Sequence, residues 1–181
     1  MPVVFGESVS SVDDSLRIFT RHGDAVRGTY RVCYLFDRHS TDPYRGAVLE
    51  RPPSLIDSPR DVVYPWEQIF VAAANCAGSD YPMLASHLRV PLDRVELIVE
   101  GVFDPRGEFD GLGEFHAPAD SAPCYLSLHL RATLVSSADH GVLETIHRRV
   151  VSRNMVLGAL RGIPRTHELI VRQPVGTASA T

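Results

Sequence analysis

Alternation between apolar and polar side chains predicts two long strands in this chain. Between 124 and 134 the even-numbered residues are apolar, whereas most of the odd-numbered residues are polar. A period of two is typical of a strand that buries one face, and we expect the apolar face to point toward helices. The segment 94–103 has a similar alternation and is followed by an Asp-Pro-Arg-Gly turn, which predicts a second strand.

Shorter β-rich runs predict further strands near the N-terminus. Residues 15–19 and 29–36 flank a His-Gly-Asp sequence, and together they predict a hairpin over 15–36. Most of the segment 37–60 is rich in Pro and predicts a loop, with one short strand at 47–49.

Apolar residues at a helical period predict a central helix over 66–88. Pro65 precedes this helix, at a position where the missing N–H costs nothing. Pro82 removes one hydrogen bond and clashes one turn earlier, so we expect it to kink or interrupt the helix near Cys76. One apolar stripe is expected to face the core, formed by Ile69, Ala72, Ala73 and Cys76.

A second helix is predicted over 139–161, with Asp139 as its N-cap. A last strand is expected at 166–172, and the tail 174–181 is expected to be disordered. One face of the second helix collects, at helical spacing, Val142, Ile146, Val150, Asn154 and Leu157. The Asn side chain is therefore expected on an otherwise buried stripe.

Two groups of strands around two apolar helices predict a single α+β domain over 1–181, not an alternation of βαβ units with a parallel sheet. A chain of 181 residues is within the size of one domain. Residues 1–11 have neither a basic start nor a continuous apolar run, and we find no apolar stretch long enough to cross a membrane. We therefore expect a cytoplasmic protein with no membrane partner.

Charge and composition exclude several classes of function. All 18 basic residues are Arg, which excludes Walker-type phosphate loops and Schiff-base chemistry, since both need a Lys. A net charge of -4 without a long basic cluster argues against nucleic acid as a partner. The three Cys and eight His residues have no spacing typical of a metal site, so we expect no metal and no other cofactor.

Two motifs carry a resemblance to a known family. The stretch Pro65-Trp66-Glu67-Gln68-Ile69-Phe70 opens an Ala-rich helix with Cys76 nine residues after the Glu. The second motif is the stretch 154–162 at the end of the second predicted helix, which closes with Leu160-Arg161-Gly162. Both resemble segments of the OsmC/Ohr family, the osmotically inducible protein C and organic hydroperoxide resistance proteins. The resemblance implies an intertwined homodimer, with antiparallel sheets wrapped around two central helices and active sites at the interface.

The resemblance also implies roles for single residues. Cys76 corresponds to the family's peroxidatic thiol, and Glu67 to the Glu that orients an active-site Arg toward it. Nine residues of straight helix separate the two by about 13 Å on opposite faces, so a contact would need the partner subunit or a bridging Arg. The N-terminal segment offers four candidates for that Arg, namely Arg17, Arg21, Arg27 and Arg31. Arg21 and Arg27 are the favoured pair, because they are next to the predicted hairpin turn.

The second cysteine of the family is replaced by Asn154. A carboxamide cannot form a disulfide, so the usual recycling through two cysteines is absent at this position. Cys33 and Cys124, both in predicted strands, are the other thiols that could serve. Asn154 itself could bond to Cys76.

Polar residues near Cys76 leave two functions open. Asn75, Asp80 and Asn154 could form a pocket, and an ionised Asp80 one turn from the thiol would disfavour a thiolate. The first hypothesis is a peroxidase of the oxidative stress response, which uses a single cysteine and an external thiol reductant against organic hydroperoxides. The alternative is a dimer without peroxidase activity, which binds a small apolar ligand or catalyses another reaction in the interface pocket.

Overall fold

The computed structural model describes residues 28–50, 65–104, 106–111, 116, 119 and 124–174. The predicted strand at 15–19, and with it the hairpin turn, lies outside these residues, as does the tail from 175 onward. The elements in chain order are β1 (Gly28–Asp37), β2 (Tyr44–Glu50), α2 (Pro65–His87), β3 (Arg94–Asp104), the 3-10 helix η2 (Arg106–Phe109), β4 (Cys124–Val135), α3 (His140–Arg153), α4 (Met155–Ala159) and β5 (Arg165–Arg172).

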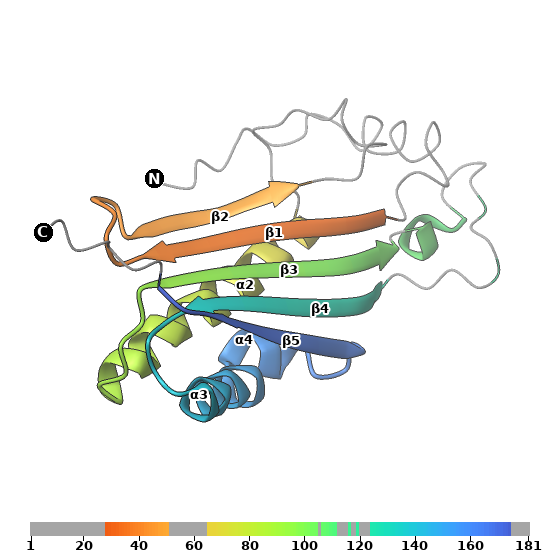
Figure 1. Ribbon diagram of the computed structural model, residues 1–181. Coiled ribbons are helices and arrows are strands. Elements are labelled where there is room, and N and C mark those ends of the chain that lie inside the picture. The colour runs from red at the N-terminus through yellow and green to blue at the C-terminus, as the bar shows by residue number, and fades with distance from the viewer. Residues whose placement is uncertain are drawn as a thin grey trace, which may run out of the picture.

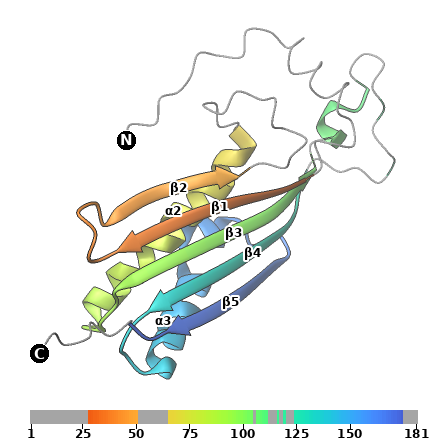
Figure 2. The ribbon, with the colours of Figure 1, turned by 45° about the horizontal axis from the view of Figure 1, so that its top comes forward.

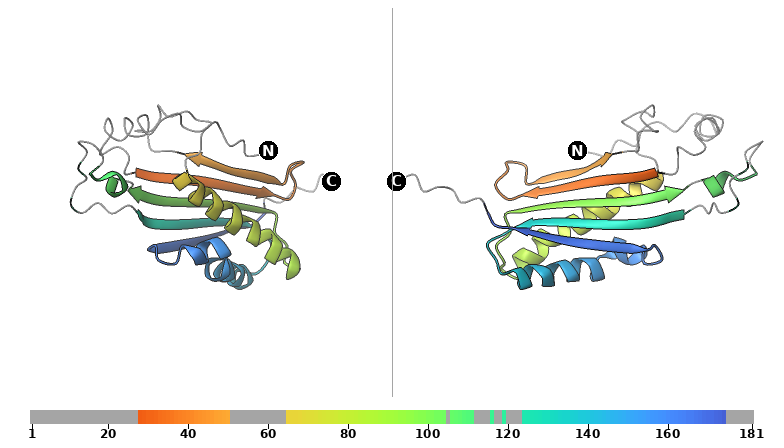
Figure 3. Two further views of the ribbon diagram at one scale, coloured as in Figure 1. Left: turned by 180° about the vertical axis from the view of Figure 1, so that it is seen from behind. Right: turned by 45° about the vertical axis from the view of Figure 1, so that its right-hand side comes forward.

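The strands form one five-stranded sheet in the order β2-β1-β3-β4-β5, which Figure 1 shows from its open face. Helices α2, α3 and α4 all lie against the other face, as the view from behind in Figure 3 shows. The α+β class predicted from the sequence is confirmed. Within the described residues there is one sheet on one side of the helices, so a sheet on their other side would have to come from elsewhere.

One pair of strands departs from the expected antiparallel pattern. β4 and β5 are parallel, whereas the three other neighbouring pairs are antiparallel. The reason is visible in Figure 2: α3 and α4 carry the chain back along the sheet, so β5 starts beside the start of β4. The sheet therefore ends in one βαβ unit that the sequence analysis did not expect.

Helix α2 has the predicted extent but buries a different stripe. Ala72 is exposed and Cys76 is only half-buried. The rotation of the helix is set by two large buried side chains, Phe70, which packs against Tyr125 of the sheet, and Tyr81, which packs against His147 of α3. The buried residues of the helix are Glu67, Phe70, Ala73, Ala74, Ala77, Gly78, Tyr81 and Ala85. An outer stripe of Gln68, Ala72, Asn75, Ser79, Met83 and Ser86 is left exposed.

Pro82 does not interrupt α2, which runs unbroken from Pro65 to His87. The expected break near Cys76 is therefore wrong. Pro removes a single backbone hydrogen bond, and the neighbouring Tyr81 and Ala85 are held in the core. The close fit of the helix on the sheet also depends on Gly78, where any side-chain carbon would collide with the ring of Tyr34 on β1.

A bulge changes the predicted alternation of β4. Phe103 pairs with Tyr125 and Val102 with Ser127, which leaves Leu126 without a partner on β3. Because one extra residue shifts the alternation, Tyr125 instead of Leu126 turns to the helix side, where its ring packs against Phe70 and Phe103. Beyond the bulge, the predicted inward residues Leu128, Leu130, Ala132 and Leu134 are buried.

The second predicted helix is divided in two at Asn154. α3 begins after the predicted N-cap Asp139, whose carboxylate accepts from the N–H of Gly141 at 2.8 Å. Asn154 has an extended backbone, with φ -60° and ψ 135°, and it both ends α3 and caps α4. Val142, expected to be inward, is 40% exposed. The inward residues of α3 are Leu143, Ile146, His147 and Val150.

Candidate functional site

The side chain of Asn154 joins the corner between α3 and α4 to the thiol on α2. Its Nδ2 lies 3.1 Å from Sγ of Cys76 and 2.7 Å from Oδ2 of Asp80. Cys76 and Asp80 are four residues apart and therefore on one face of the helix. The structure thus brings together three of the residues that the sequence analysis selected.

The orientation of this amide is determined by the fold. Oδ1 of Asn154 accepts a hydrogen bond from the N–H of Leu157 at 3.0 Å, as the N-cap of α4. Because a backbone N–H can only donate, the oxygen must face Leu157, and the NH₂ group must face Cys76 and Asp80. Asn154 is 3% exposed, and both of its N–H groups and its oxygen have partners.

The chain around α4 supports this corner. The guanidinium of Arg165, at the start of β5, donates to the carbonyl oxygen of Leu157. The corner is therefore held at its start by the Asn154 side chain and further along by β5. The N–H that faces the Cys76 thiol is therefore held through the same side chain that caps α4.

A second buried polar chain crosses from α2 to β5 beside this site. The hydroxyl of Tyr81 lies 2.7 Å from Nδ1 of His147, and Nε2 of His147 lies 3.1 Å from Nδ1 of His167. Tyr81 and His147 are 0% and 3% exposed, whereas His167 on β5 is exposed. The chain therefore connects the core to solvent.

Burial makes both inner groups of this chain hard to charge. Burial first, and then the neighbouring imidazole of His167, lower the pKa of His147 to about 4, against a smaller opposing effect of Glu144. Burial, with a smaller contribution from Asp80, raises the pKa of Tyr81 far above its ordinary value. At neutral pH both groups are thus uncharged and serve as hydrogen-bond partners.

The other predicted site residues do not join Cys76. Glu67 is fully buried in the first turn of α2, two and a half turns before the thiol. Asn75 lies on the exposed outer stripe of the same helix, so its assignment to a pocket with Asp80 and Asn154 has no contact to support it. Arg21 and Arg27 lie outside the described residues.

Sequence reasoning did not select Tyr81 and His147. The usable signal was their place in the helical period: His147 lies four residues after the buried Leu143, and Tyr81 four residues after the buried Ala77. A polar ring on such a buried face needs a partner, and two of them on facing helices predict a contact.

Cys33 is not placed to act on Cys76. It lies on β1 between Val32 and Tyr34, which are both buried on the helix side, so its side chain is on the open face of the sheet. The side chain of Cys124 lies outside the described part of the chain, and the bulge at Leu126 removes the alternation from which its inward position was predicted.

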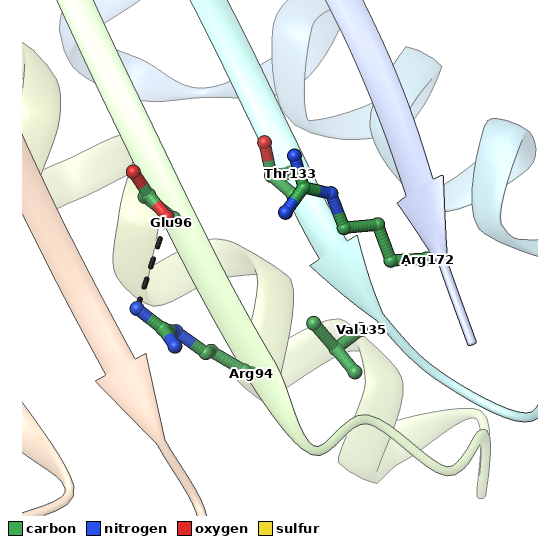
Figure 4. A pocket seen from close by; sticks show the side chains of 5 residues that line it. All are labelled: Arg94, Glu96, Thr133, Val135 and Arg172. Carbon is green, nitrogen blue, oxygen red and sulfur yellow. Dashed lines mark ion pairs between the residues drawn. The ribbon is translucent and has the colours of Figure 1, made fainter. Parts of the chain in front are cut away.

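A small hollow of about 50 Å³ lies on the open face, lined by Arg94, Glu96, Thr133, Val135 and Arg172. Figure 4 shows Arg94 beside Glu96 on β3, and Arg172 reaching from β5 toward Thr133. The Arg94–Glu96 ion pair is 3.8 Å long, and both side chains are about half exposed. Because the sheet separates this hollow from the helices, it is not part of the Cys76 site.

Within the described ranges, no three His, Cys, Asp or Glu side chains converge as a metal ion would require. None of the described helices combines the length and the apolar character needed to span a membrane.

Comparison with known proteins gives matches among solved structures. No protein-family model matches the chain, and no curated protein matches its sequence. The chain is similar to the crystal structure of a hypothetical protein from Aquifex aeolicus VF5, with 13% identity and a TM-score of 0.49 over 62% of this chain and 76% of that one.

Two further solved structures carry family names. An OsmC-like protein from Mycoplasma pneumoniae is 13% identical over 81% of this chain and 96% of that one, with a TM-score of 0.48. An organic hydroperoxide resistance protein OsmC from Legionella pneumophila, also described as a predicted redox protein, is 14% identical over 78% and 96%, with a TM-score of 0.46.

Proposed function

We propose that this protein is an OsmC-like thiol peroxidase that reduces organic hydroperoxides with Cys76 alone. The observation that carries the proposal is the hydrogen bond from Asn154 Nδ2 to Cys76 Sγ at 3.1 Å. Cys76 is half-buried, and its contact with the amide fixes where the sulfur lies. The two sequence motifs support the choice of reaction.

The reaction needs no metal or cofactor. The Cys76 thiolate attacks one oxygen of the hydroperoxide, the O–O bond breaks, and the departing alkoxide takes a proton to become an alcohol. The sulfur is oxidised to a sulfenic acid. Asn154 donates to the sulfur before the attack, which favours the charged nucleophile.

Recycling must use thiols from outside the chain. A first external thiol attacks the sulfenic sulfur, which releases water and leaves a mixed disulfide on Cys76. A second external thiol then attacks that disulfide, which returns the Cys76 thiol and releases the oxidised reductant. Cys33 on the opposite face of the sheet and an amide at position 154 both agree with such a scheme.

The proposal extends to a homodimer formed through the helical face. The outer stripe of α2 is exposed, and Met83 and Met155 on this face are 60% and 82% exposed. A second copy packed here would cover the stripe and place a sheet on the far side of the helices. Glu67 and one of Arg21 or Arg27 would then complete the site, as the family resemblance implies.

Asp80 supports the alternative function. Its carboxylate shares the Asn154 amide with the thiol, at 2.7 Å from the same nitrogen, and a negative charge so near disfavours a thiolate. A protein without peroxidase activity would keep this polar cluster to bind a small ligand at the interface.

Trapping of the oxidised thiol distinguishes the two functions. The protein is exposed briefly to cumene hydroperoxide with dimedone, and the labelled residue is mapped by peptide mass spectrometry. We expect stoichiometric label on Cys76, loss of hydroperoxide consumption in Cys76→Ser, and unchanged consumption in the matched control Cys33→Ser. An unlabelled Cys76 under conditions that oxidise a free thiol would reject the peroxidase and leave the ligand-binding function.

A further inference from the structure

Helix α3 touches α2 at two polar points that are two turns apart. His147 reaches Tyr81, and Asn154, seven residues later, reaches Cys76. Residues seven apart lie on nearly the same side of a helix, so one rigid helix carries both contacts. A change in the distance between His147 and α2 is therefore transmitted to Asn154.

The hydrogen bonds of His147 to Tyr81 and His167 depend on how many protons the two imidazoles carry. The neutral chain can run in either of two directions. In the first, the Tyr81 hydroxyl donates to Nδ1 of His147 and Nε2–H of His147 donates to Nδ1 of His167; in the second, both donors and acceptors are exchanged. In the first direction, a proton on Nδ1 of His167 opposes the N–H of His147 across 3.1 Å. The whole chain must then reverse, with Nδ1–H of His147 donating to Tyr81, or the contact must open.

When both imidazoles are fully protonated, neither Nε2 of His147 nor Nδ1 of His167 can accept a hydrogen bond from the other. The groups that face His147 are Tyr81 from α2, with Asp80 beside it, His167 from β5, and Glu144 one turn earlier on α3. Only Glu144 favours a charge on His147, and burial together with His167 outweighs it, so the pKa of His147 falls to about 4. A doubly charged pair is accommodated most easily when α3 moves away.

We propose that His147 is a positioning residue for the Cys76 site, and that proton uptake by the His147–His167 pair loosens the hydrogen bond between Asn154 and Cys76. The importance of this coupling for peroxide reduction rests on the proposed function, whereas the coupling itself does not. At low pH the movement of α3 would then weaken the hydrogen bond from Asn154 to the Cys76 thiol, although Asn154 itself takes up no proton.

Nuclear magnetic resonance titration of the full chain tests this coupling. The imidazole signals of His147 and the side-chain NH₂ signals of Asn154 are followed as the pH is lowered. The carboxylate of Asp80 contacts the same amide, so the Asn154 signals alone do not identify the group that causes a change. We therefore use His167→Ala, a substitution at an exposed position that removes the imidazole repelling a charge on His147. It is expected to raise the midpoint of the His147 titration by about half a pH unit or more.

The expected result is that one component of the Asn154 signal moves with His147 and by the same amount. His129→Ala is the matched control, because His129 on β4 bonds to Thr166 of β5 on the open face, and it should move neither signal. His147→Gln, which keeps a polar side chain but cannot take a proton, should abolish the component.

A His147 midpoint that shifts in His167→Ala while every component of Asn154 stays in place would overturn the proposal. The same holds if His147→Gln folds and leaves the Asn154 profile unchanged. Neither readout involves a peroxide, so a Cys76 that fails to react with cumene hydroperoxide rejects the proposed function and leaves this coupling intact.

Discussion

Asn154 donates to Cys76 across 78 positions of sequence and a gap of 3.1 Å. The same side chain accepts from the backbone N–H of Leu157. The position of the amide group that donates to the Cys76 thiol is therefore fixed by the start of α4. Substitutions can separate these two roles. Several short polar side chains can accept from the backbone as a helix cap, but few of them also have an N–H group that can donate to the thiol.

Asn154→Asp should slow the reaction of Cys76 with iodoacetamide by roughly tenfold at neutral pH, since a carboxylate replaces the N–H donor at the sulfur. The fold should persist, because Asp also caps a helix. The alkylation rate is measured by mass spectrometry, with Cys33 as the internal reference. Asp80→Asn should act in the opposite direction, and equal rates in all three proteins would exclude electrostatic control of this thiol.

Stability should fall in mild acid because of His147. Its pKa is about 4 in the folded protein and about 6.5 in the unfolded chain, so between these values the unfolded state binds more protons. The free energy of unfolding should therefore decrease as the pH falls from about 6.5 to about 4, by about 3 kcal/mol at most. Urea titrations at several pH values measure this slope. His147→Gln should reduce it, and a slope that is identical in this variant would contradict the assignment.

The predictions from sequence succeeded where apolar residues repeat with the period of the strand or helix that contains them. The alternation of β3 and of β4 beyond the bulge, the extent of α2 and the start of α3 depend on local pattern and on burial against a single layer. The rotation of α2 could not be predicted in this way, because Ala72 and Ala74 are equivalent as sequence and only the burial of Phe70 and Tyr81 in the core selects one of them.

The site was predictable in part. Cys76 and Asn154 were selected by their motifs, and Asp80 by its spacing of one turn from the thiol. The division of the second helix was not expected, because Asn154 sits in register with apolar residues on both sides. The hydrogen bond to Leu157 gives the Asn its capping role, and that bond depends on the backbone turning there. The Tyr81–His147 contact likewise depends on how two helices meet.

A buried ion pair near the end of β3 should contribute strongly to stability. Arg106 and Asp104 are 7% and 3% exposed, and the guanidinium donates from Nε and Nη2 to both carboxylate oxygens, each at 2.9 Å. Arg106→Met removes the guanidinium partner of a buried carboxylate and should cost about 3 to 5 kcal/mol. Arg131→Met breaks the exposed pair with Glu168 and should cost less than about 1 kcal/mol. Chemical denaturation compares them, and similar losses would show that burial does not control the effect.

The fit of α2 on β1 should be sensitive to a single methyl group. Gly78→Ala pushes a carbon into the buried ring of Tyr34 and should destabilise the protein by about 1 to 3 kcal/mol. At Gly158 on α4 an added carbon meets nothing within 4 Å, so Gly158→Ala should be neutral or stabilising by up to about 1 kcal/mol. Thermal unfolding of both variants provides the comparison, and a neutral Gly78→Ala would mean that the helix can shift.

The proposed homodimer should depend on the helical face. Met83→Asp combined with Met155→Asp places two charges on that face and should halve the mass measured by light scattering at micromolar concentration. Val48→Asp is the control, because Val48 is also well exposed, at 63%, but lies on the edge strand β2. A wild-type protein that has the mass of one chain would already reject the dimer.

The joint between α3 and α4 limits how this protein can change in evolution. A cysteine at position 154 would supply a thiol for recycling but would remove the oxygen that caps α4, since a thiol accepts hydrogen bonds only weakly. Position 154 can thus hold either a cysteine for an internal disulfide or a residue that caps α4 well. In this chain it holds the capping residue, Asn154. A variant with a thiol at position 154 would also have to stabilise α4 in another way.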